Sequence, residues 1–391
     1  MTRAAFALLA LVLATPIPAR DVVKAEVILM RHGVRSPTKP ASLYRDVAKG
    51  EWPAWPVGPG MLTAHGAQGM QRIGARLGTI LRDEGALPAG CDAVVVIGDS
   101  TARNRESSVA LARGLLPACP PRYLATAGDT NNPLFHYRKD ADGDDAPVAP
   151  SVAPAALADL QALLLDCHGD ACARVAGDDG KRLLLPTPDQ LGKALKLAGT
   201  LSENLMLAYA EGMPMAQVAF GRGDAALLGR LITLHNAQFA ATKRAMPTAA
   251  AMGSNLAAHI AATLAVGTTA RPLTNHGVVV LVGHDTNLAN VAGVLDLDWH
   301  EPTRPDDYPP GGALAFARVE HDGKAFIRVR AWMPSMDQLR TNTFDGMRPT
   351  PVRIAGCSKE GECTVAEFAR VVATGVDERF VDEELPAMTK Q

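Results

Sequence analysis

The sequence lacks an excess of charge of either sign, internal repeats and the usual zinc-binding motifs. Its 391 residues carry 39 Lys+Arg and 41 Asp+Glu, a formal net charge of −2. No global field would therefore hold nucleic acid or an anionic membrane. The absence of a C-x-x-C pair, of H-E-x-x-H and of a histidine pair at helical ligand spacing argues against zinc. We expect no metal or other cofactor and no nucleic-acid partner. An anionic substrate would need positive charge concentrated locally.

What is present is the composition of an ordinary globular protein. Hydrophobic residues make up 47% and charged residues 20% of the chain, which argues against general disorder. The length exceeds what one minimal core needs, so a large domain with a second one beside or inside it is expected. The 28 Pro and 35 Gly imply many turns and argue against a coiled coil or a plain helical bundle.

The N-terminus has the pattern of a secretory signal peptide over residues 1–19. Arg3 precedes an unbroken apolar run over 4–14, and the segment ends in a small residue, Ala19. The run is shorter than the roughly 20 apolar residues that span a bilayer, and no later run is long enough. A buried N-terminal helix is the alternative, but the segment has no polar face to show water. We expect a mature chain that starts near residue 20, is periplasmic or secreted, and does not contact the membrane.

The cysteine count agrees with an exported chain. The six cysteines are Cys91, Cys119, Cys167, Cys172, Cys357 and Cys363. An even count in an exported protein suggests disulfides, although six cysteines allow 15 pairings. Proximity in the sequence favours Cys91–Cys119, Cys167–Cys172 and Cys357–Cys363.

Three apolar segments are predicted to be buried strands, and each runs directly into a polar cluster. The segments span residues 22–30, 93–97 and 277–282, and a helix is expected over 288–295. Buried strands that alternate with helices predict an α/β fold, with a mostly parallel central sheet flanked by helices. Ligands of such sheets bind beyond the carboxyl ends of the strands. We therefore expect the three clusters to converge on one site.

The middle of the chain is rich in Ala and Leu with helical spacing, over residues 155–165, 190–207, 225–242 and 255–264. This pattern predicts a mostly helical domain over 146–264, inserted into an α/β domain made of 20–145 and 265–391. The acidic stretch 140–146 is interpreted as a solvated turn, because its spacing does not match a calcium loop. Segments 316–319 and 326–332 are expected to form a hairpin across Asp322-Gly323.

The clusters at the strand ends carry three arginines, Arg31, Arg35 and Arg103. Each guanidinium can grip two oxygens of a tetrahedral oxyanion, so three together suit a dianionic phosphoryl group. Arg31 and Arg35 could instead be surface ion-pair partners. For the third position, Arg105 is as good a candidate as Arg103 on the residues alone.

His32 lies between Arg31 and Arg35, and these cations should lower its pKa and keep its imidazole neutral and nucleophilic. That arrangement suits covalent catalysis through phosphohistidine. Asp285 could protonate the leaving alkoxide, or it could be only an N-cap, and His284 could hold a phosphoryl oxygen.

Several motifs in the chain match one known family. The longest runs from Arg31 to Lys39 (R-H-G-V-R-S-P-T-K), and the others are Gly283–Asn287, Trp52–Val57, Leu62–Gly66, Leu234–Phe239 and Pro309–Gly312. With these motifs the sequence resembles the histidine acid phosphatases of the phosphoglycerate-mutase-like superfamily. It is most similar to the bacterial periplasmic branch of 4-phytases and glucose-1-phosphatases, over nearly the whole mature chain.

The resemblance implies a role for each matching position. His32 would be the nucleophile and Asp285 the proton donor. The phosphoryl group would be bound by Arg31, Arg35, Arg103 and His284, with Arg103 favoured over Arg105. The substrate pocket would be lined by Thr38, Lys39 and Glu203. The family's cysteine pattern supports the three proposed disulfides.

One departure from the family bears on the substrate. Phytase-type members often carry a basic residue downstream of the Leu234–Phe239 segment, but residues 246–254 contain no Lys or Arg. Phytate, a sugar phosphate such as glucose 1-phosphate, and broad monoester hydrolysis therefore stay open. The alternatives are a cytosolic mutase or sugar bisphosphatase, and a phosphate-binding module without turnover. The signal peptide counts against the first, and the presence of both His32 and Asp285 counts against the second. We expect a monomeric acid phosphomonoesterase.

Overall fold

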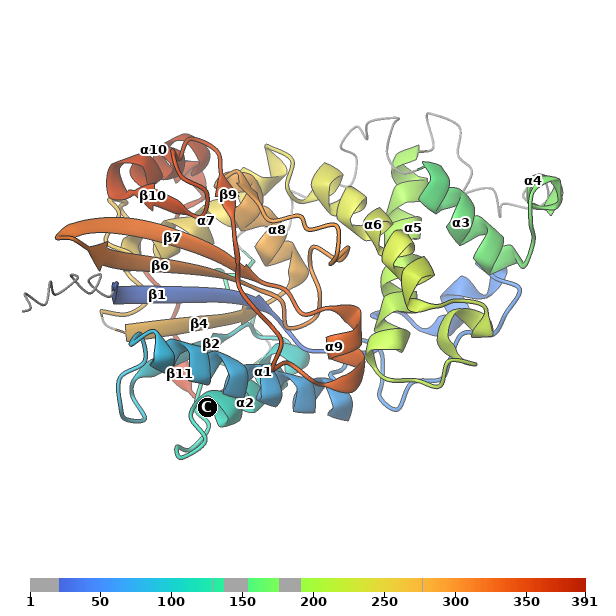
Figure 1. The fold of residues 1–391 in the computed structure, drawn as a ribbon, viewed down its shortest axis with the longest axis horizontal. Coiled ribbons are helices and arrows are strands. Elements are labelled where there is room, and N and C mark those ends of the chain that lie inside the picture. The colour runs from blue at the N-terminus through green and yellow to red at the C-terminus, as the bar shows by residue number, and fades with distance from the viewer. Residues whose placement is uncertain (1–20, 129, 137–153, 176–190, 276) are drawn as a thin grey trace, which may run out of the picture.

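The computed structural model describes residues 21–128, 130–136, 154–175, 191–275 and 277–391 (Figure 1). The predicted signal peptide over 1–19 and the acidic stretch 140–146 lie outside the described residues. The described part consists of a large sheet with helices on both faces and a group of helices beside it. Among these helices, none combines the length and apolar character needed to cross a bilayer.

The central sheet has the strand order β10-β7-β6-β1-β4-β2-β3-β11, and β8 pairs with β7. Its strands are β1 (Val22–Arg31), β2 (Val94–Gly98), β3 (Leu124–Ala125), β4 (Gly277–Gly283), β6 (Ala313–His321), β7 (Lys324–Trp332), β8 (Thr350–Pro351), β10 (Glu362–Thr364) and β11 (Thr389–Lys390). A small separate sheet pairs β5 (Leu297–Asp298) with β9 (Arg353–Ile354).

The predicted α/β class is confirmed, but parallel pairing is confined to the centre of the sheet. Strands β1, β4, β2 and β3 are parallel neighbours, whereas β6, β7, β10 and β11 join antiparallel. The sheet is therefore mixed, and "mostly parallel" holds only for the strands that carry the polar clusters. The antiparallel side arises from the predicted hairpin of β6 and β7. At its turn Asp322 and Gly323 both have positive φ, 50° and 73°, as the tight turn of such a hairpin requires.

Strand β1 is buried on both faces, since alternate side chains of a strand point to opposite sides of a sheet. Val27 and Leu29 belong to one apolar cluster, which includes helices α7 (Thr248–Thr263), α8 (Asp285–Val294) and α10 (Val365–Gly375). Ile28 and Met30 belong to another, which includes α1 (Ala64–Asp83) and α2 (Ala102–Leu115). Figure 1 shows these two helical layers above and below the sheet.

The helices beside the sheet form a third apolar cluster. They are α3 (Pro154–Leu165), α5 (Leu191–Ala210) and α6 (Ala225–Thr242), with the 3₁₀ helices η1 (Ala41–Val47) and η5 (Val218–Gly221) at their margin. The short helices α4 (Asp170–Val175), α9 (Met336–Thr341) and η6 (Glu378–Phe380) complete the described helices.

The predicted division into domains stays a prediction, and the packing of two segments bears on it. Helix α7 falls within 146–264, yet residues such as Leu256 and Ile260 pack in the core above the sheet. Conversely, Tyr44 and Trp52 precede that range but pack with the helical cluster. Helical periodicity shows that a segment is a helix, but not which surface the helix covers.

All three disulfides favoured by sequence proximity are present. They join Cys91 to Cys119, Cys167 to Cys172 and Cys357 to Cys363. No free cysteine is found among the described residues.

The buried carboxyl group of Glu26 on β1 should make the fold more stable in mild acid than at neutral pH. Its side chain is buried 3.4 Å from Arg330, and its Oε2 has no partner. Burial outweighs the attraction of Arg330 and raises the pKa of Glu26 from its ordinary 4.5 to about 7. Between these values the folded chain binds more protons than the unfolded chain. The free energy of unfolding should therefore fall as pH rises through this window, by up to about 3 kcal/mol from Glu26.

The measurement is urea unfolding of the wild type and of Glu26→Gln at pH 4.5 and at pH 7. The glutamine variant should match the wild type more closely at pH 4.5 and be the more stable of the two at pH 7. Glu320→Gln, on the exposed part of β6, is the matched control and should leave the difference between the two pH values unchanged. An equal dependence on pH in wild type and Glu26→Gln would contradict the assignment.

Candidate active site

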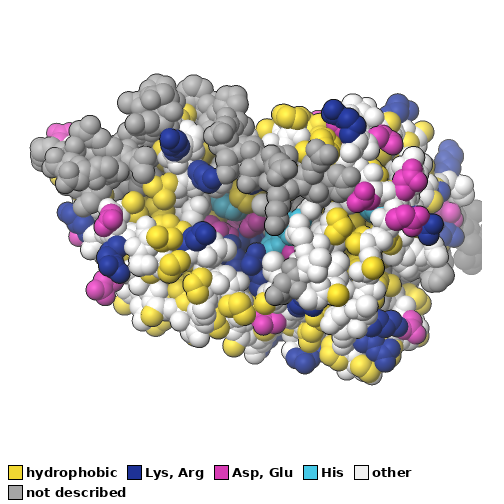
Figure 2. Space-filling view, turned by 180° about the vertical axis from the view of Figure 1, so that it is seen from behind, with side chains coloured by type: hydrophobic (Ala, Val, Ile, Leu, Met, Phe, Trp, Pro, Cys, Tyr) yellow, Lys and Arg dark blue, Asp and Glu magenta, His cyan; other side chains and the backbone are white. Residues whose placement is uncertain are grey.

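Three strand ends bring the predicted clusters to one edge of the sheet. In the parallel register Arg31 pairs with Gly283, and Gly98 pairs with Val282. The next residues are tied in the same way, because the His32 amide donates to the Gly283 carbonyl at 2.9 Å. Figure 2 shows basic, acidic and histidine side chains gathered in a hollow of the surface. The convergence expected from the sequence is therefore confirmed for the strand ends.

His32 is buried, and its ring is oriented by the backbone. Its Nδ1 lies 2.9 Å from the carbonyl oxygen of Gly33. A carbonyl can only accept, so Nδ1 carries the proton and the lone pair of the neutral ring is on Nε2. Burial first, and then the charges of Arg31, Arg103 and Arg35, hold the pKa of His32 well below its ordinary value. Burial thus adds to the effect of the neighbouring cations.

The glycine after His32 allows close packing of the loop against two helices. A Cβ on Gly33 would lie 2.7 Å from Met70 Cγ and 2.8 Å from the carbonyl oxygen of Gly66, both on α1. The Gly33 amide donates to Ser107 Oγ on α2 at 3.1 Å. Any side chain here would push the loop off α1 and move His32 with it.

Two of the predicted arginines share a buried counter-charge. Arg31 Nη2 and Arg35 Nη2 both donate to Oε1 of Glu203, the second at 2.9 Å. Arg31 Nη2 also lies 2.9 Å from Asp285 Oδ2, and its Nη1 donates to the Tyr308 carbonyl. Glu203 was predicted to line the substrate pocket. The structure places its carboxylate against both guanidinium groups, so it neutralises and orients them.

The third cation of the site is Arg103, and Arg105 points elsewhere. Arg103 Nη2 lies 3.2 Å from His284 Nδ1. Arg105 Nε donates to the Ser100 carbonyl at 2.8 Å, and its Nη2 donates to the Thr126 carbonyl at 3.0 Å. Arg105 therefore ties the start of α2, which carries Arg103, to the backbone at Ser100 and Thr126. The sequence alone left Arg103 and Arg105 as equal candidates for the third cation, and the positions of their side chains favour Arg103.

His284 is held by side chains that sequence reasoning did not identify as functional. Its Nε2 lies 2.8 Å from Asp99 Oδ2 and 3.0 Å from Asn104 Nδ2, and His136 Nε2 lies 3.1 Å from the same Asp99 oxygen. Burial would raise the pKa of Asp99, but its contacts with His136 and His284 outweigh that and lower it. Because Arg103 can only donate to Nδ1, neutral His284 carries its proton on Nε2 and donates it to Asp99.

Asp285 is the first residue of α8, and it does not cap the helix. The N-cap position belongs to His284, whose amide donates to Asn287 Oδ1 at 2.8 Å. Asp285 Oδ1 accepts from the Thr286 amide at 2.8 Å, and its other oxygen faces Arg31. Burial would raise the pKa of Asp285, but the charges of Arg31, His235 and Arg35 outweigh it and hold the pKa well below its ordinary value. Without substrate, Asp285 is ionised.

Known proteins match nearly the whole chain. No protein-family model matches the chain. Phytase AppA of Escherichia coli (strain K12) is 32% identical over 400 residues, which cover 90% of this chain and 91% of that protein. The chain belongs to the histidine acid phosphatase family. A glucose-1-phosphatase of Providencia rettgeri is 24% identical and covers 97% of this chain and 98% of its own.

The fold of this histidine acid phosphatase is shared with solved relatives. The apo form of a Hafnia alvei phytase superposes with a TM-score of 0.81 and 29% identity, covering 94% of this chain and all of that one. The predicted branch of phytases and glucose-1-phosphatases is therefore confirmed.

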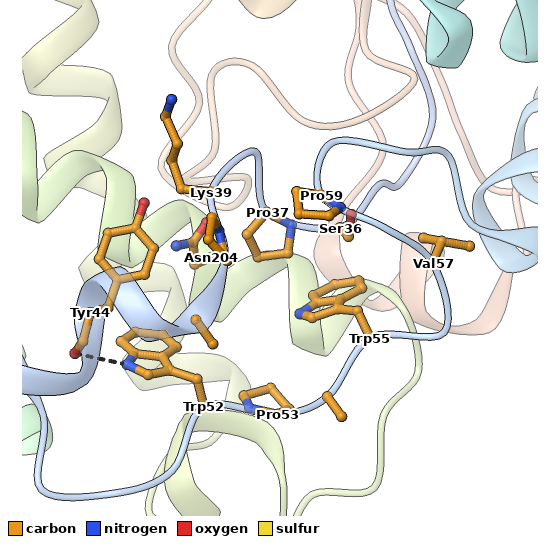
Figure 3. A pocket seen from close by; sticks show the side chains of 13 residues that line it. Ser36, Pro37, Lys39, Tyr44, Trp52, Pro53, Trp55, Val57, Pro59 and Asn204 are labelled. Carbon is orange, nitrogen blue, oxygen red and sulfur yellow. Dashed lines mark hydrogen bonds between the residues drawn. The ribbon is translucent and has the colours of Figure 1, made fainter.

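Two predicted substrate residues lie at the exposed rim of the site. Thr38 and Lys39 are both exposed, on the loop that follows Arg35. Lys39 borders a cavity of about 170 Å³ that is lined mainly by proline and aromatic side chains. Figure 3 shows Tyr44, Trp52 and Trp55 around this cavity, with the amino group of Lys39 directed away from the indole rings. No hydrogen bond from Thr38 or Lys39 to the three arginines is found among the described residues.

Proposed function

We propose that this chain is an acid phosphomonoesterase that works through a phosphohistidine intermediate. One observation carries the proposal: a neutral imidazole with its lone pair on Nε2 stands among three arginines at the end of a strand. The relatives named phytase and glucose-1-phosphatase support the same class of reaction, the hydrolysis of phosphate monoesters.

The reaction consists of two in-line displacements. In the first, Nε2 of His32 attacks phosphorus, the P–O bond to the alcohol breaks, and the leaving oxygen takes a proton from Asp285. In the second, water attacks the phosphohistidine, its proton goes to Asp285, and His32 and inorganic phosphate are released. The guanidinium groups of Arg31, Arg35 and Arg103 stabilise the charge on the phosphoryl oxygens. His284 provides a further contact with the phosphoryl group.

Substrate binding gives Asp285 the proton it must donate. In the free enzyme Arg31 is 2.9 Å from Asp285 and favours the carboxylate. A phosphoryl dianion placed against Arg31 offsets that charge and repels the carboxylate, so the pKa of Asp285 rises on binding. Activity should therefore be highest in acid and decline as pH rises past the pKa of Asp285 in the complex.

A polyol or sugar phosphate, phytate included, is the proposed substrate. A Hafnia alvei phytase of the same fold has been solved with myo-inositol hexakis sulphate, which supports phytate. Phytate carries several phosphate groups and would need cations beyond those that bind the reacting phosphoryl group. Arg244, one candidate, is already engaged, since it donates to the Leu297 carbonyl and stacks on Trp299. The aromatic cavity beside Lys39 favours a second candidate, a broad phosphatase that also accepts esters with an apolar leaving group. Rates with phytate, glucose 1-phosphate and an aryl phosphate decide between the two.

We also infer that the chain is exported to the periplasm or the medium, which the three disulfides support. The mature protein should begin near residue 20 and contain no free thiol. Intact mass with and without reduction and alkylation measures both properties. A full-length chain with six alkylated cysteines before reduction would contradict export. The monomeric state and the absence of a nucleic-acid partner stay predictions.

Replacing the proposed nucleophile should abolish turnover without unfolding the protein. His32→Ala removes Nε2, so no phosphoenzyme can form, whereas a substitution in a distant histidine such as His321→Ala should leave the rate near that of the wild type. Rapid quenching with ³²P-labelled substrate should trap an acid-labile phosphoenzyme in wild type and His321→Ala only. If folded His32→Ala kept more than a small fraction of activity, the mechanism would be wrong.

The effect of Asp285→Asn should depend on the leaving group. An alkoxide needs the proton, and its rate should fall by about 10²–10⁴-fold, whereas p-nitrophenolate is stable as an anion and should lose far less. Loss of the ion pair with Arg31 would lower both rates alike, so the ratio of the two losses isolates proton donation. Asp298→Asn, at a surface carboxylate paired with Arg353, is the control. Equal losses for both substrates would remove Asp285 from the role of acid.

A further inference from the structure

Beside the phosphate site, three potential metal ligands converge from three separate segments. Asp99 follows β2, His284 follows β4, and His136 is the last residue of the described segment 130–136. Asp99 Oδ2 is 2.8 Å from His284 Nε2 and 3.1 Å from His136 Nε2, and all three ligand atoms lie within 4.8 Å of one another. The proposed reaction makes no use of His136.

Two imidazole nitrogens and one carboxylate oxygen are ligands that zinc and similar transition metals bind well. Metal–ligand bonds of about 2.0–2.2 Å place neighbouring ligand atoms roughly 3.3 Å apart in a tetrahedron. The two closest spacings here are slightly shorter, so side-chain shifts of a few tenths of an ångström would admit the ion. The His136 side chain is 26% exposed, which gives the ion a route from solvent.

A fourth buried polar group, Asn104, borders the same place. Asn104 is fully buried, and its Nδ2 lies 3.0 Å from both Asp99 Oδ2 and His284 Nε2. Its Oδ1 has no hydrogen-bond partner, which is costly for a buried amide. Nδ2 faces the point where the three ligands meet. A half-turn of the amide would offer Oδ1 to an ion there in exchange for the hydrogen bond from Nδ2 to Asp99.

A second cluster, with two carboxylates and one histidine, offers a contrast. Glu203, His235 and Asp285 also bring ligand atoms within 4.8 Å. However, both carboxylates already pair with the buried guanidinium of Arg31, so a metal ion would have to displace a permanent cation. In the cluster at Asp99, the ion would displace only protons on imidazole nitrogens.

We propose that Asp99, His136 and His284 form a binding site for a divalent transition-metal ion such as Zn²⁺, and that its occupation inhibits the enzyme. The ion takes Nε2 of His284, so the proton of that ring moves to Nδ1. Nδ1 then faces Arg103, 3.2 Å away, as donor against donor, so Arg103 loses the contact that holds its guanidinium beside His284 and is displaced from the position in which it would bind a phosphoryl group. The inhibition rests on the proposed function, whereas the binding does not.

Binding is measured directly on the untagged mature enzyme. Titration calorimetry with Zn²⁺ should show one saturable site that His136→Ala weakens at least tenfold. Co²⁺ should give the absorption bands of a site with nitrogen and oxygen ligands in the wild type and lose them in His136→Ala. His300→Ala is the matched control, because His300 is half-exposed and also contacts a carboxylate, Asp307 at 2.9 Å. Absence of saturable binding, or equal affinity in wild type and His136→Ala, overturns the site.

Inhibition is measured with p-nitrophenyl phosphate, which sequesters zinc far less than a polyphosphate does. Each variant is compared with its own rate in the absence of metal. Zn²⁺ should inhibit wild type and His300→Ala, EDTA should restore the rate, and His136→Ala should need at least tenfold more zinc. Zinc that binds through His136 without lowering the rate overturns the inhibitory role. A wild type without phosphatase activity would overturn the proposed function, while calorimetry would still decide the metal site.

Discussion

The site depends on how the positive charge of buried guanidinium groups is compensated at the edge of an apolar sheet. Burying a cation is costly unless a counter-charge accompanies it, and Arg31 is fully buried. Glu203 from α5 and Asp285 from α8 supply that charge. Because β1, α5 and α8 each contribute one partner, the ion pairs that prepare phosphoryl binding also join the helical group to the sheet.

The same arrangement sets the protonation states that the reaction requires. Burial and the arginines keep His32 neutral, and the arginines keep Asp285 ionised until a substrate offsets their charge. In the proposed reaction, a single set of cations therefore favours the nucleophile in the free enzyme and allows the acid to form only in the complex. Asp99 contributes indirectly, because its hydrogen bond with His284 fixes the orientation of that ring.

The sequence was informative about candidate site residues that directly follow a predicted strand. Apolar runs located the strands that end at Arg31, Gly98 and Gly283. Apolar residues at helical spacing located the helices α3, α5 and α6. The hairpin of β6 and β7 was expected, but its antiparallel pairing with β1 could not be predicted, because the spacing of apolar residues does not show which strands become neighbours. Nor could the contacts of Glu203, Asn104 and His136, since each meets the site only through tertiary packing. Arg103 and Arg105 are two residues apart, and only the backbone carbonyls around Arg105 distinguish them.

The disulfides have a consequence for how this chain is made. Each bond joins cysteines that follow one another in the sequence, with separations of 28, 5 and 6 residues. A chain that enters an oxidising compartment N-terminus first can close each pair before the next pair emerges. Non-native disulfides between cysteines of different pairs then have little opportunity to form. Biogenesis should therefore require an oxidant but depend little on a disulfide isomerase.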